Sequence, residues 1–292
     1  MPALAAEFSA GALFGAALTA AGIYSPTTIK AQMHLADFTM LQTFLAASAS
    51  GALAVHLADR LGFAPLNPRP PQSLGCFAYD GNVVGGALLG CGMAATGACP
   101  GTALVQTAAG LRTGPYVVLG GLVGALVHHH HGVVAVLFRR SPSRSRATPP
   151  NKQEERPATT LQDSLRLGTN ALLLAWELLC LLAIAAAEAF RRSAPSTPAA
   201  PAGLVGPVAG GCLIGLAQAA TVLLTRHSIG VSAAYGSLAR AVSGEGALVT
   251  PSVVFAAGML GGTAVVVRRF ADGGALETVG ADGGAVAALV GG

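Results

Sequence analysis

The fold is decided by the stretch Gly85–Thr102, which reads GGALLGCGMAATGACPGT. Its first part is apolar and has small residues at every fourth position, Gly86 and Gly90 among them, which is typical of a helix that packs closely on another. Pro100 fits the first position of a new helix, and a proline also pushes the residue before it out of helical geometry. We therefore predict a broken helix whose second part begins after Cys99.

The composition is that of a membrane protein. Of the 292 residues, 52% are hydrophobic, 10% are charged and 39 are glycine. Soluble domains usually carry about 25% charged residues, and glycine is frequent in membrane helices because it allows backbones to approach closely. The five cysteines have no paired spacing that indicates a disulfide framework. We predict an all-α, multi-pass integral membrane protein, located in the plasma membrane.

Apolar runs predict about seven to nine membrane-embedded segments, some of them broken or re-entrant helices. The segments form two halves, residues 1–138 and 169–292, joined by a polar, flexible linker over residues 139–168. The run Thr169–Phe190 is the clearest full span, because it has the ~20 residues that a bilayer needs. The other apolar runs are 8–23, 38–57, 82–98, 102–110, 115–138, 205–224 and 252–267.

Three of these runs begin with two glycines four residues apart and then break. They start at Gly11, Gly86 and Gly211, and the first two starts are 75 residues apart. The same interval after Gly211 reaches Val286, so we expect a fourth motif where the sequence ends. Two halves with two broken helices each are typical of transporters built from internal repeats. The alternative is that helices rich in Ala and Gly resemble one another by composition.

A helix break at membrane depth leaves backbone groups without partners, and this is tolerated where the break is packed in protein or lines a cavity. The N-terminus of the second helical part offers N–H groups and a positive dipole end to an anion. This places Cys99 next to an anion, together with Gly97, Pro100, Gly101 and Thr102. We expect the neutral thiol to donate weakly through S–H, and the amides and the Thr102 hydroxyl to donate more strongly. The alternative is a small buried cysteine without a role.

The other two breaks supply matching donors. Ser25 and Thr27 stand at the first break, and Ser228 and Ser232 flank Gly230 at the third. We expect these hydroxyl groups to meet the same anion as the thiol of the second break.

The remaining cysteines are weaker candidates. Cys91 lies eight residues before Cys99, about two helical turns, so we place it on the same path. Cys180 and Cys212 lie within apolar runs and are expected to be ordinary buried residues, whereas Cys76 lies in a loop.

Polar residues elsewhere suggest no metal site and no cofactor. The four histidines His128–His131 are consecutive, so their side chains point around a helix and do not converge. Glu188 stands beside arginines and is expected at the membrane surface, whereas Glu177 is in mid-span, where it would pair with a polar group or take up a proton. Lys30 and Arg112 follow the first two breaks and are candidates for an electropositive entrance, or alternatively for snorkelling at the interface. Arg226 and His227 stand by the third break, where they would attract an anion or, alternatively, belong to a solvated helix end.

Four motifs carry a family resemblance: GCGMAATGACPGT at Gly90–Thr102, GIYSP at Gly22–Pro26, GLAQ at Gly215–Gln218 and GVS at Gly230–Ser232. Together they resemble the YeeE/YedE sulphur-transport family. The resemblance covers nearly the whole chain except the linker, and GACPGT is its most specific part.

The resemblance implies uptake of thiosulfate or a related sulphur-containing ion along a narrow path. Cysteines in the broken-helix motifs would hold the ion by S–H contacts, and Cys99 matches one of them. At the first break Ser25 follows Tyr24 where bacterial relatives have Cys, and the last glycine-rich cysteine motif is not in the sequence.

We therefore expect a transporter rather than an enzyme. Its expected partners are a small inorganic sulphur-containing anion, the lipid bilayer and a sulphur-carrier or enzyme on the cytoplasmic side, with no nucleic acid. The first alternative is a membrane-embedded sulphur-transfer enzyme with Cys99 as nucleophile, although no general base accompanies the motif. The second is a structural membrane subunit in which the breaks are packing kinks.

Overall fold

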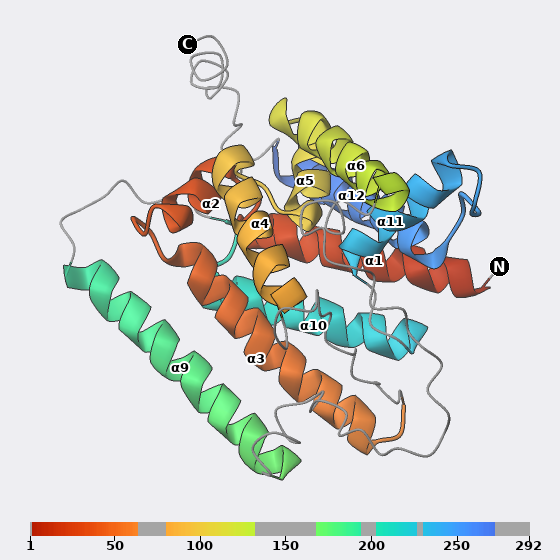
Figure 1. Ribbon diagram of the computed structural model, residues 1–292. Coiled ribbons are helices and arrows are strands. Elements are labelled where there is room, and N and C mark those ends of the chain that lie inside the picture. The colour runs from red at the N-terminus through yellow and green to blue at the C-terminus, as the bar shows by residue number, and fades with distance from the viewer. Residues whose placement is uncertain (1, 64–79, 132–167, 194–202, 227–229, 272–292) are drawn as a thin grey trace, which may run out of the picture.

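The computed structural model describes residues 2–63, 80–131, 168–193, 203–226 and 230–271. All the regular structure in these residues is helical (Figure 1), as the apolar runs predict. Within the described ranges, six stretches are long and apolar enough to span a membrane. They are Ala3–Ala21, Thr39–Arg60, Gly81–Ala108, Thr169–Arg192, Pro207–Thr225 and Pro251–Phe270. The larger predicted number counted the run 102–110 separately, whereas here it belongs to the stretch Gly81–Ala108, and it included the run 115–138, which is not among the six.

The second break forms where the proline predicts it. Helix α4 (Asp80–Thr96) ends at Gly97, whose φ of +68° lies in the left-handed region that glycine adopts at little cost. Cys99 has an extended backbone and is the N-cap of α5 (Pro100–Ala108), which starts with a proline. The chain therefore changes direction within three residues, without a β-strand or a long loop.

The first break follows the same rules. Helix α1 (Pro2–Ala21) ends at Gly22, whose φ is +72°. Ser25 is extended, and α2 (Pro26–Met33) begins with the proline that follows it. Helix α1 begins six residues before the predicted apolar run 8–23.

The third break also joins a long helix to a short one. Helix α10 (Pro207–Thr225) ends at Arg226, whose φ of +60° is left-handed although the residue is not glycine. Gly230 is extended and precedes α11 (Val231–Val242). All three predicted breaks are therefore present, while their origin in an internal repeat stays a prediction.

Helices α1 and α12 (Pro251–Ala271) pack with their backbones in contact. Gly11 and Gly15 on α1 face the α12 backbone, and Gly258 and Gly262 on α12 face the α1 backbone. A Cβ atom at any of the four would collide with the facing main chain. Small residues are what allow this approach in a membrane protein.

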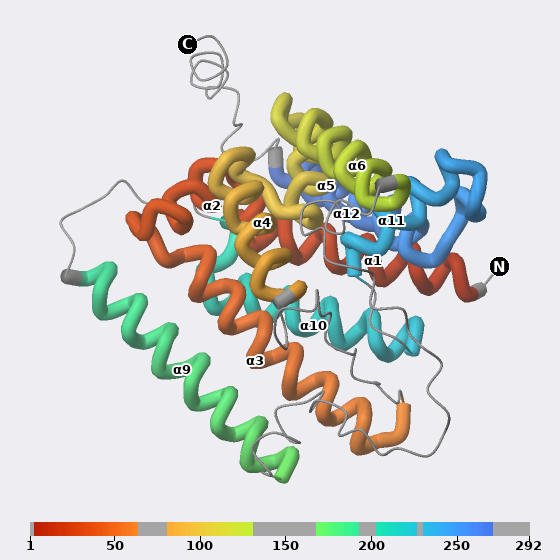
Figure 2. Tube along the Cα trace, in the orientation of Figure 1, coloured from red at the N-terminus to blue at the C-terminus, as the bar shows by residue number. Residues whose placement is uncertain are grey.

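The other long helices surround this pair. Helix α10 packs on α3 (Thr39–Arg60) through Gly211 and Gly215 in the same way. Helix α9 (Thr169–Ser193) runs beside α3 at the edge of the molecule (Figure 2). Its exposed leucines, which are suited to contact lipid, are Leu174, Leu178, Leu179, Leu181 and Leu182.

Helix α6 (Thr113–His131) covers α5 and α11, and α12 contacts both of these short helices from another side. The short helices after the second and third breaks are therefore enclosed by protein on several sides. Several predictions concern residues outside the described ranges: the linker except Gly168, Cys76, His227, Ser228 and the glycine-rich end 283–292.

Candidate functional site

The first and second breaks lie against each other. A Cβ atom built on Gly97 would be 3.0 Å from Cβ of Pro26. Gln106 in α5 is fully buried, and its Nε2 donates to the carbonyl of Tyr24 at 2.8 Å and to that of Gly97 at 3.0 Å. One side-chain amide therefore satisfies a carbonyl oxygen from each break, where helical partners are missing.

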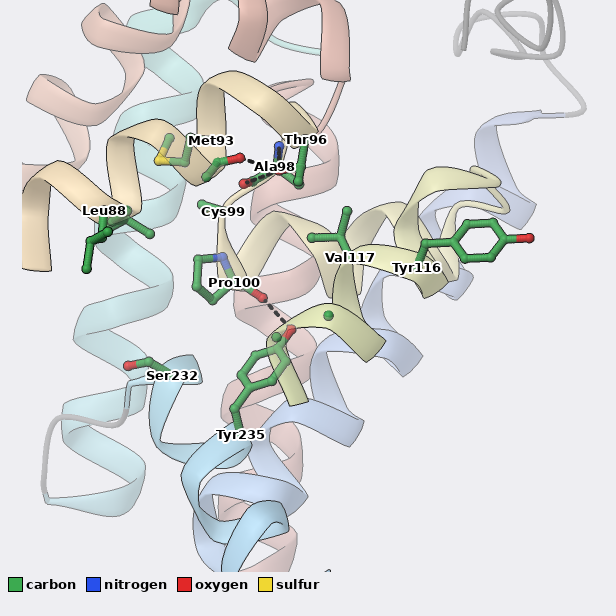
Figure 3. A pocket seen from close by; sticks show the side chains of 14 residues that line it. Leu88, Met93, Thr96, Ala98, Cys99, Pro100, Tyr116, Val117, Ser232 and Tyr235 are labelled. Atoms are coloured by element: carbon green, nitrogen blue, oxygen red, sulfur yellow. Dashed lines mark hydrogen bonds between the residues drawn. The ribbon is translucent and has the colours of Figure 1, made fainter. Parts of the chain in front are cut away.

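The helix after the third break reaches the start of α5 (Figure 3). The Tyr235 hydroxyl donates to the carbonyl of Pro100 at 3.1 Å. Its ring lies against α6, because a Cβ on Gly121 would come within 2.9 Å of it. Val231 is also close, since a Cβ on Gly101 would be 3.9 Å from its Cγ2. All three breaks thus meet around α5.

Cys99 and Thr102 form a reciprocal cap at the start of α5. The Cys99 N–H donates to the Thr102 hydroxyl at 2.7 Å, and the Thr102 N–H donates to the Cys99 sulphur at 3.4 Å. The Thr102 hydroxyl also lies 3.3 Å from the sulphur and 3.2 Å from the Cys99 carbonyl. Because the sulphur accepts hydrogen bonds from the helix side, its own S–H hydrogen remains to donate elsewhere. Thr102 therefore supports the thiol and does not line the cavity.

A cavity of about 490 Å³ lies beside Cys99, between α4, α6 and α11 (Figure 3). Its walls are mainly apolar, with Leu88, Leu89 and Met93 from α4. Ser232, in the first turn of α11, stands in the wall together with Cys99. The N-termini of α5 and α11 therefore both reach the cavity, each with one side chain that can donate a hydrogen bond.

Other polar groups in the wall are directed elsewhere. The Thr96 hydroxyl donates to the carbonyl of Gly92 in its own helix at 2.7 Å. Figure 3 shows the Tyr116 side chain pointing away from Cys99, and the Tyr235 hydroxyl is bonded to the backbone. The Cys99 thiol and the Ser232 hydroxyl are thus the side-chain donors best placed for a ligand.

The structure brings together part of the predicted set of site residues. Cys99, Pro100 and Ser232 line the cavity. The predicted residues that do not line it are Ser25, Thr27, Cys91, Gly97, Gly101, Thr102 and Gly230. Most of these build the breaks behind the cavity wall.

Ser25 and Cys91 are two of the predicted residues that do not line the cavity. Ser25 is buried, and its hydroxyl is 2.7 Å from that of Thr27, so the two side chains satisfy each other. Cys91 is exposed and does not line the cavity, although its neighbour Gly92 does. The helical period that placed Cys91 near Cys99 does not continue across the break.

Two residues of the site were not predicted. Tyr235 follows Ser232 by three residues, one helical turn, and a helix beginning at Gly230 would have placed both on one face. Gln106 is an amide within an otherwise apolar and small-residue segment, and such a residue usually needs a buried partner. Both signals were present in the sequence but depended on knowing which helices meet.

None of the described residues that line the cavity carries a charge, so Lys30, Arg112 and Arg226 do not contribute to its wall. The attraction for an anion would come from the helix N-termini. Within the described ranges, no three His, Cys, Asp or Glu side chains are close enough to hold a metal ion.

The remaining polar candidates lie away from the cavity. His129 Nε2 is 2.9 Å from Glu245 Oε2, and His130 Nε2 is 2.9 Å from the Ser243 hydroxyl, which ties the end of α6 to the turn after α11. Glu188 accepts hydrogen bonds from neighbouring arginines of α9, as expected for the end of a span. Glu177 is half-buried, and one of its carboxylate oxygens has no hydrogen-bond partner among the described residues.

Comparison with protein families matches residues 20–292 to the model described as sulphur transport. The chain belongs to the sulphur transport family. This is the YeeE/YedE family, and the match starts near the end of α1 and continues to the last residue. Comparison with curated proteins found no match.

A sulphur transport family protein with six membrane-length helices in its described part is an integral, multi-pass membrane protein. The role of such a protein is sulphur-related transport across the membrane.

Proposed function

We propose that this sulphur transport family member moves a small sulphur-containing anion of the thiosulfate type, held where α5 and α11 begin. The observation that carries the proposal is the position of Cys99. It caps α5, its sulphur accepts from Thr102, and it stands in the cavity wall with Ser232. Two positive helix ends and two weak donors therefore face one space.

The character of the cavity favours this kind of anion. Its wall is mainly apolar and carries no charged side chain among the described residues. A strongly hydrated anion would lose much of its hydration there for few hydrogen bonds. A larger, more polarizable anion with a terminal sulphur loses less, and it can contact the Cys99 thiol and the Met93 thioether, which also lines the cavity.

A sulphur-transfer enzyme would need a base beside the Cys99 nucleophile. Within the described ranges, no His, Asp or Glu lines the cavity. A purely structural subunit would have no need for a cavity at the breaks. The geometry therefore supports transport better than either alternative.

Uptake by purified protein tests the proposal. The protein is reconstituted in liposomes, and the initial rate of radiolabelled thiosulfate uptake is measured. Cys99→Ala should reduce the rate at least about tenfold, which corresponds to the loss of about 1.4 kcal/mol of stabilisation. The matched variants Cys180→Ala and Cys212→Ala, whose side chains do not line the cavity, should keep the wild-type rate.

Equal rates in Cys99→Ala and Cys180→Ala would contradict the proposal. Conversion of thiosulfate by the detergent-solubilised protein, without a membrane, would favour the enzyme. Absence of uptake by correctly folded wild-type protein would favour the structural subunit.

A further inference from the structure

Gln106 is a polar residue in an unusual place. It lies in α5 next to Val105, its side chain is fully buried, and it is not part of the cavity wall. Its Nε2 donates to Tyr24 at the first break and to Gly97 at the second. Both amide hydrogens are therefore used to join two breaks that are far apart in the sequence.

The oxygen of this amide indicates that the two hydrogen bonds from Nε2 stabilise the structure. Gln106 Oε1 is buried and has no hydrogen-bond partner among the described residues. A buried polar atom without a partner is costly, and an apolar side chain of the same size would avoid the cost. The benefit that offsets it lies in the two bonds from Nε2.

We propose that Gln106 is a positioning residue that fixes the Cys99 thiol at the cavity by holding the second break against the first. Gly97 precedes Cys99 by two residues, and Gln106 follows it by seven, about two helical turns. The Gln106–Gly97 bond thus closes a short loop of chain around Cys99, and the Gln106–Tyr24 bond anchors that loop to a neighbouring element.

The surroundings leave Gln106 little freedom to move. Helix α6 lies directly behind it, because a Cβ on Gly114 would be 2.8 Å from the Gln106 carbonyl carbon. On the other side, Gly97 is in contact with Pro26. Removing the side-chain amide should therefore change the conformation of the chain at the break and leave α5 in place, because α6 packs against the α5 backbone.

The consequence for transport rests on the proposed function, whereas the consequence for the thiol does not. Without the two bonds, the carbonyls of Tyr24 and Gly97 lose their partner, and the chain around Cys99 gains other arrangements. The thiol would then be presented differently to any reagent in the cavity. An anion bound through that thiol would bind more weakly, with less effect on the maximal rate.

The test uses Gln106→Met, which keeps the side-chain size and removes both donors. Gln42→Met is the matched control, because Gln42 is also buried but lies in α3 and bonds to Glu188. Two quantities are measured: the rate of Cys99 alkylation by a maleimide, in protein whose other cysteines are replaced, and the KM and maximal rate of thiosulfate uptake. Gln106→Asn, with a shorter reach, is used if the Met variant does not fold.

We expect Gln106→Met to change the alkylation rate at least about fivefold and to raise KM more than it lowers the maximal rate, with no change in Gln42→Met. An altered alkylation rate with unchanged uptake would uphold the positioning role and contradict the proposed anion site. An unchanged alkylation rate, or the same change in Gln42→Met, would overturn the positioning role.

Discussion

The first and second breaks are built from the same parts but have different surroundings. Ser25 and Cys99 both have extended backbones, and both precede a proline at the start of a short helix. Ser25 is 4% exposed and its hydroxyl pairs with Thr27, whereas Cys99 is partly exposed in the wall of a cavity. Local sequence therefore sets the position of a break, and the packing around it decides whether the break faces a ligand.

The N-caps of α2 and α5 do not follow the usual residue preference. Serine is among the preferred N-cap residues and cysteine is not, yet Ser25 makes no cap bond and Cys99 makes a reciprocal one. The second helical position explains the difference. In α2 this position is Thr27, whose hydroxyl forms a hydrogen bond with the Ser25 hydroxyl. In α5 it is Gly101, which has no side chain that could bond to Cys99 in place of the cap.

The third helical position shows the same contrast. Thr102 in α5 completes the cap with Cys99. Thr28, its counterpart in α2, is left with a buried hydroxyl that has no hydrogen-bond partner among the described residues. The first break is thus closely packed and has no side-chain cap, whereas at the second break the Thr102 hydroxyl and N–H bond to Cys99.

The largest effect is expected from the contact between the two breaks. Gly97→Ala should lower the free energy of unfolding by about 2–4 kcal/mol, because a left-handed backbone disfavours a side chain and the new Cβ would press on Pro26. Gly110 has a similar φ of +81° with open space around it, so Gly110→Ala should cost only about 1–2 kcal/mol. Thermal unfolding in detergent measures both, and equal losses would show that the breaks do not press on each other.

A smaller effect separates the two threonines. Thr102→Val should cost about 1–2 kcal/mol, because it removes the cap of α5 and leaves the Cys99 N–H without its partner. Thr28→Val should be neutral or slightly stabilising, because the hydroxyl it removes has no hydrogen-bond partner in the described part of the chain. The same unfolding assay compares the pair. A loss in Thr28→Val as large as that in Thr102→Val would mean that the first break is capped after all.

The smallest effect concerns the second helical position. A Cβ on Gly101 would meet only ordinary contacts, 3.9 Å from the Cys99 sulphur and from Val231. Gly101→Ala should therefore be tolerated, whereas Gly101→Thr adds a hydroxyl that competes for the cap, as Thr27 does in α2. We expect the Thr variant to be less stable than the Ala variant by about 0.5–1 kcal/mol. If Gly101→Thr and Gly101→Ala are equally stable, Thr27 is not the reason that Ser25 makes no cap.

The sequence was sufficient to locate the breaks because proline and glycine constrain the backbone locally. Gly97 follows the last residue of α4 and Pro100 is the first residue of α5, as these rules predict. The cavity was not predictable in this way, because it depends on how α4, α6 and α11 pack. Cys91 was placed on the path by counting turns, but a count of turns does not carry across a break.

Tyr235 and Gln106 were missed for a related reason. Each acts on a backbone carbonyl of another segment, at Pro100 for Tyr235 and at Tyr24 for Gln106. A single sequence shows which side chains can donate, but the acceptor is fixed only when distant segments come together. The family match does not supply these contacts either, since it identifies the kind of protein and not the role of each residue.

Protection of one thiol tests the central claim most directly. In folded protein whose other four cysteines are replaced, the rate at which a maleimide alkylates Cys99 is measured with increasing thiosulfate, and with sulfate as the comparison anion. An anion held at the start of α5 and α11 predicts that thiosulfate slows alkylation in a saturable manner and that sulfate does so much less. An alkylation rate that stays the same at every thiosulfate concentration would contradict the account.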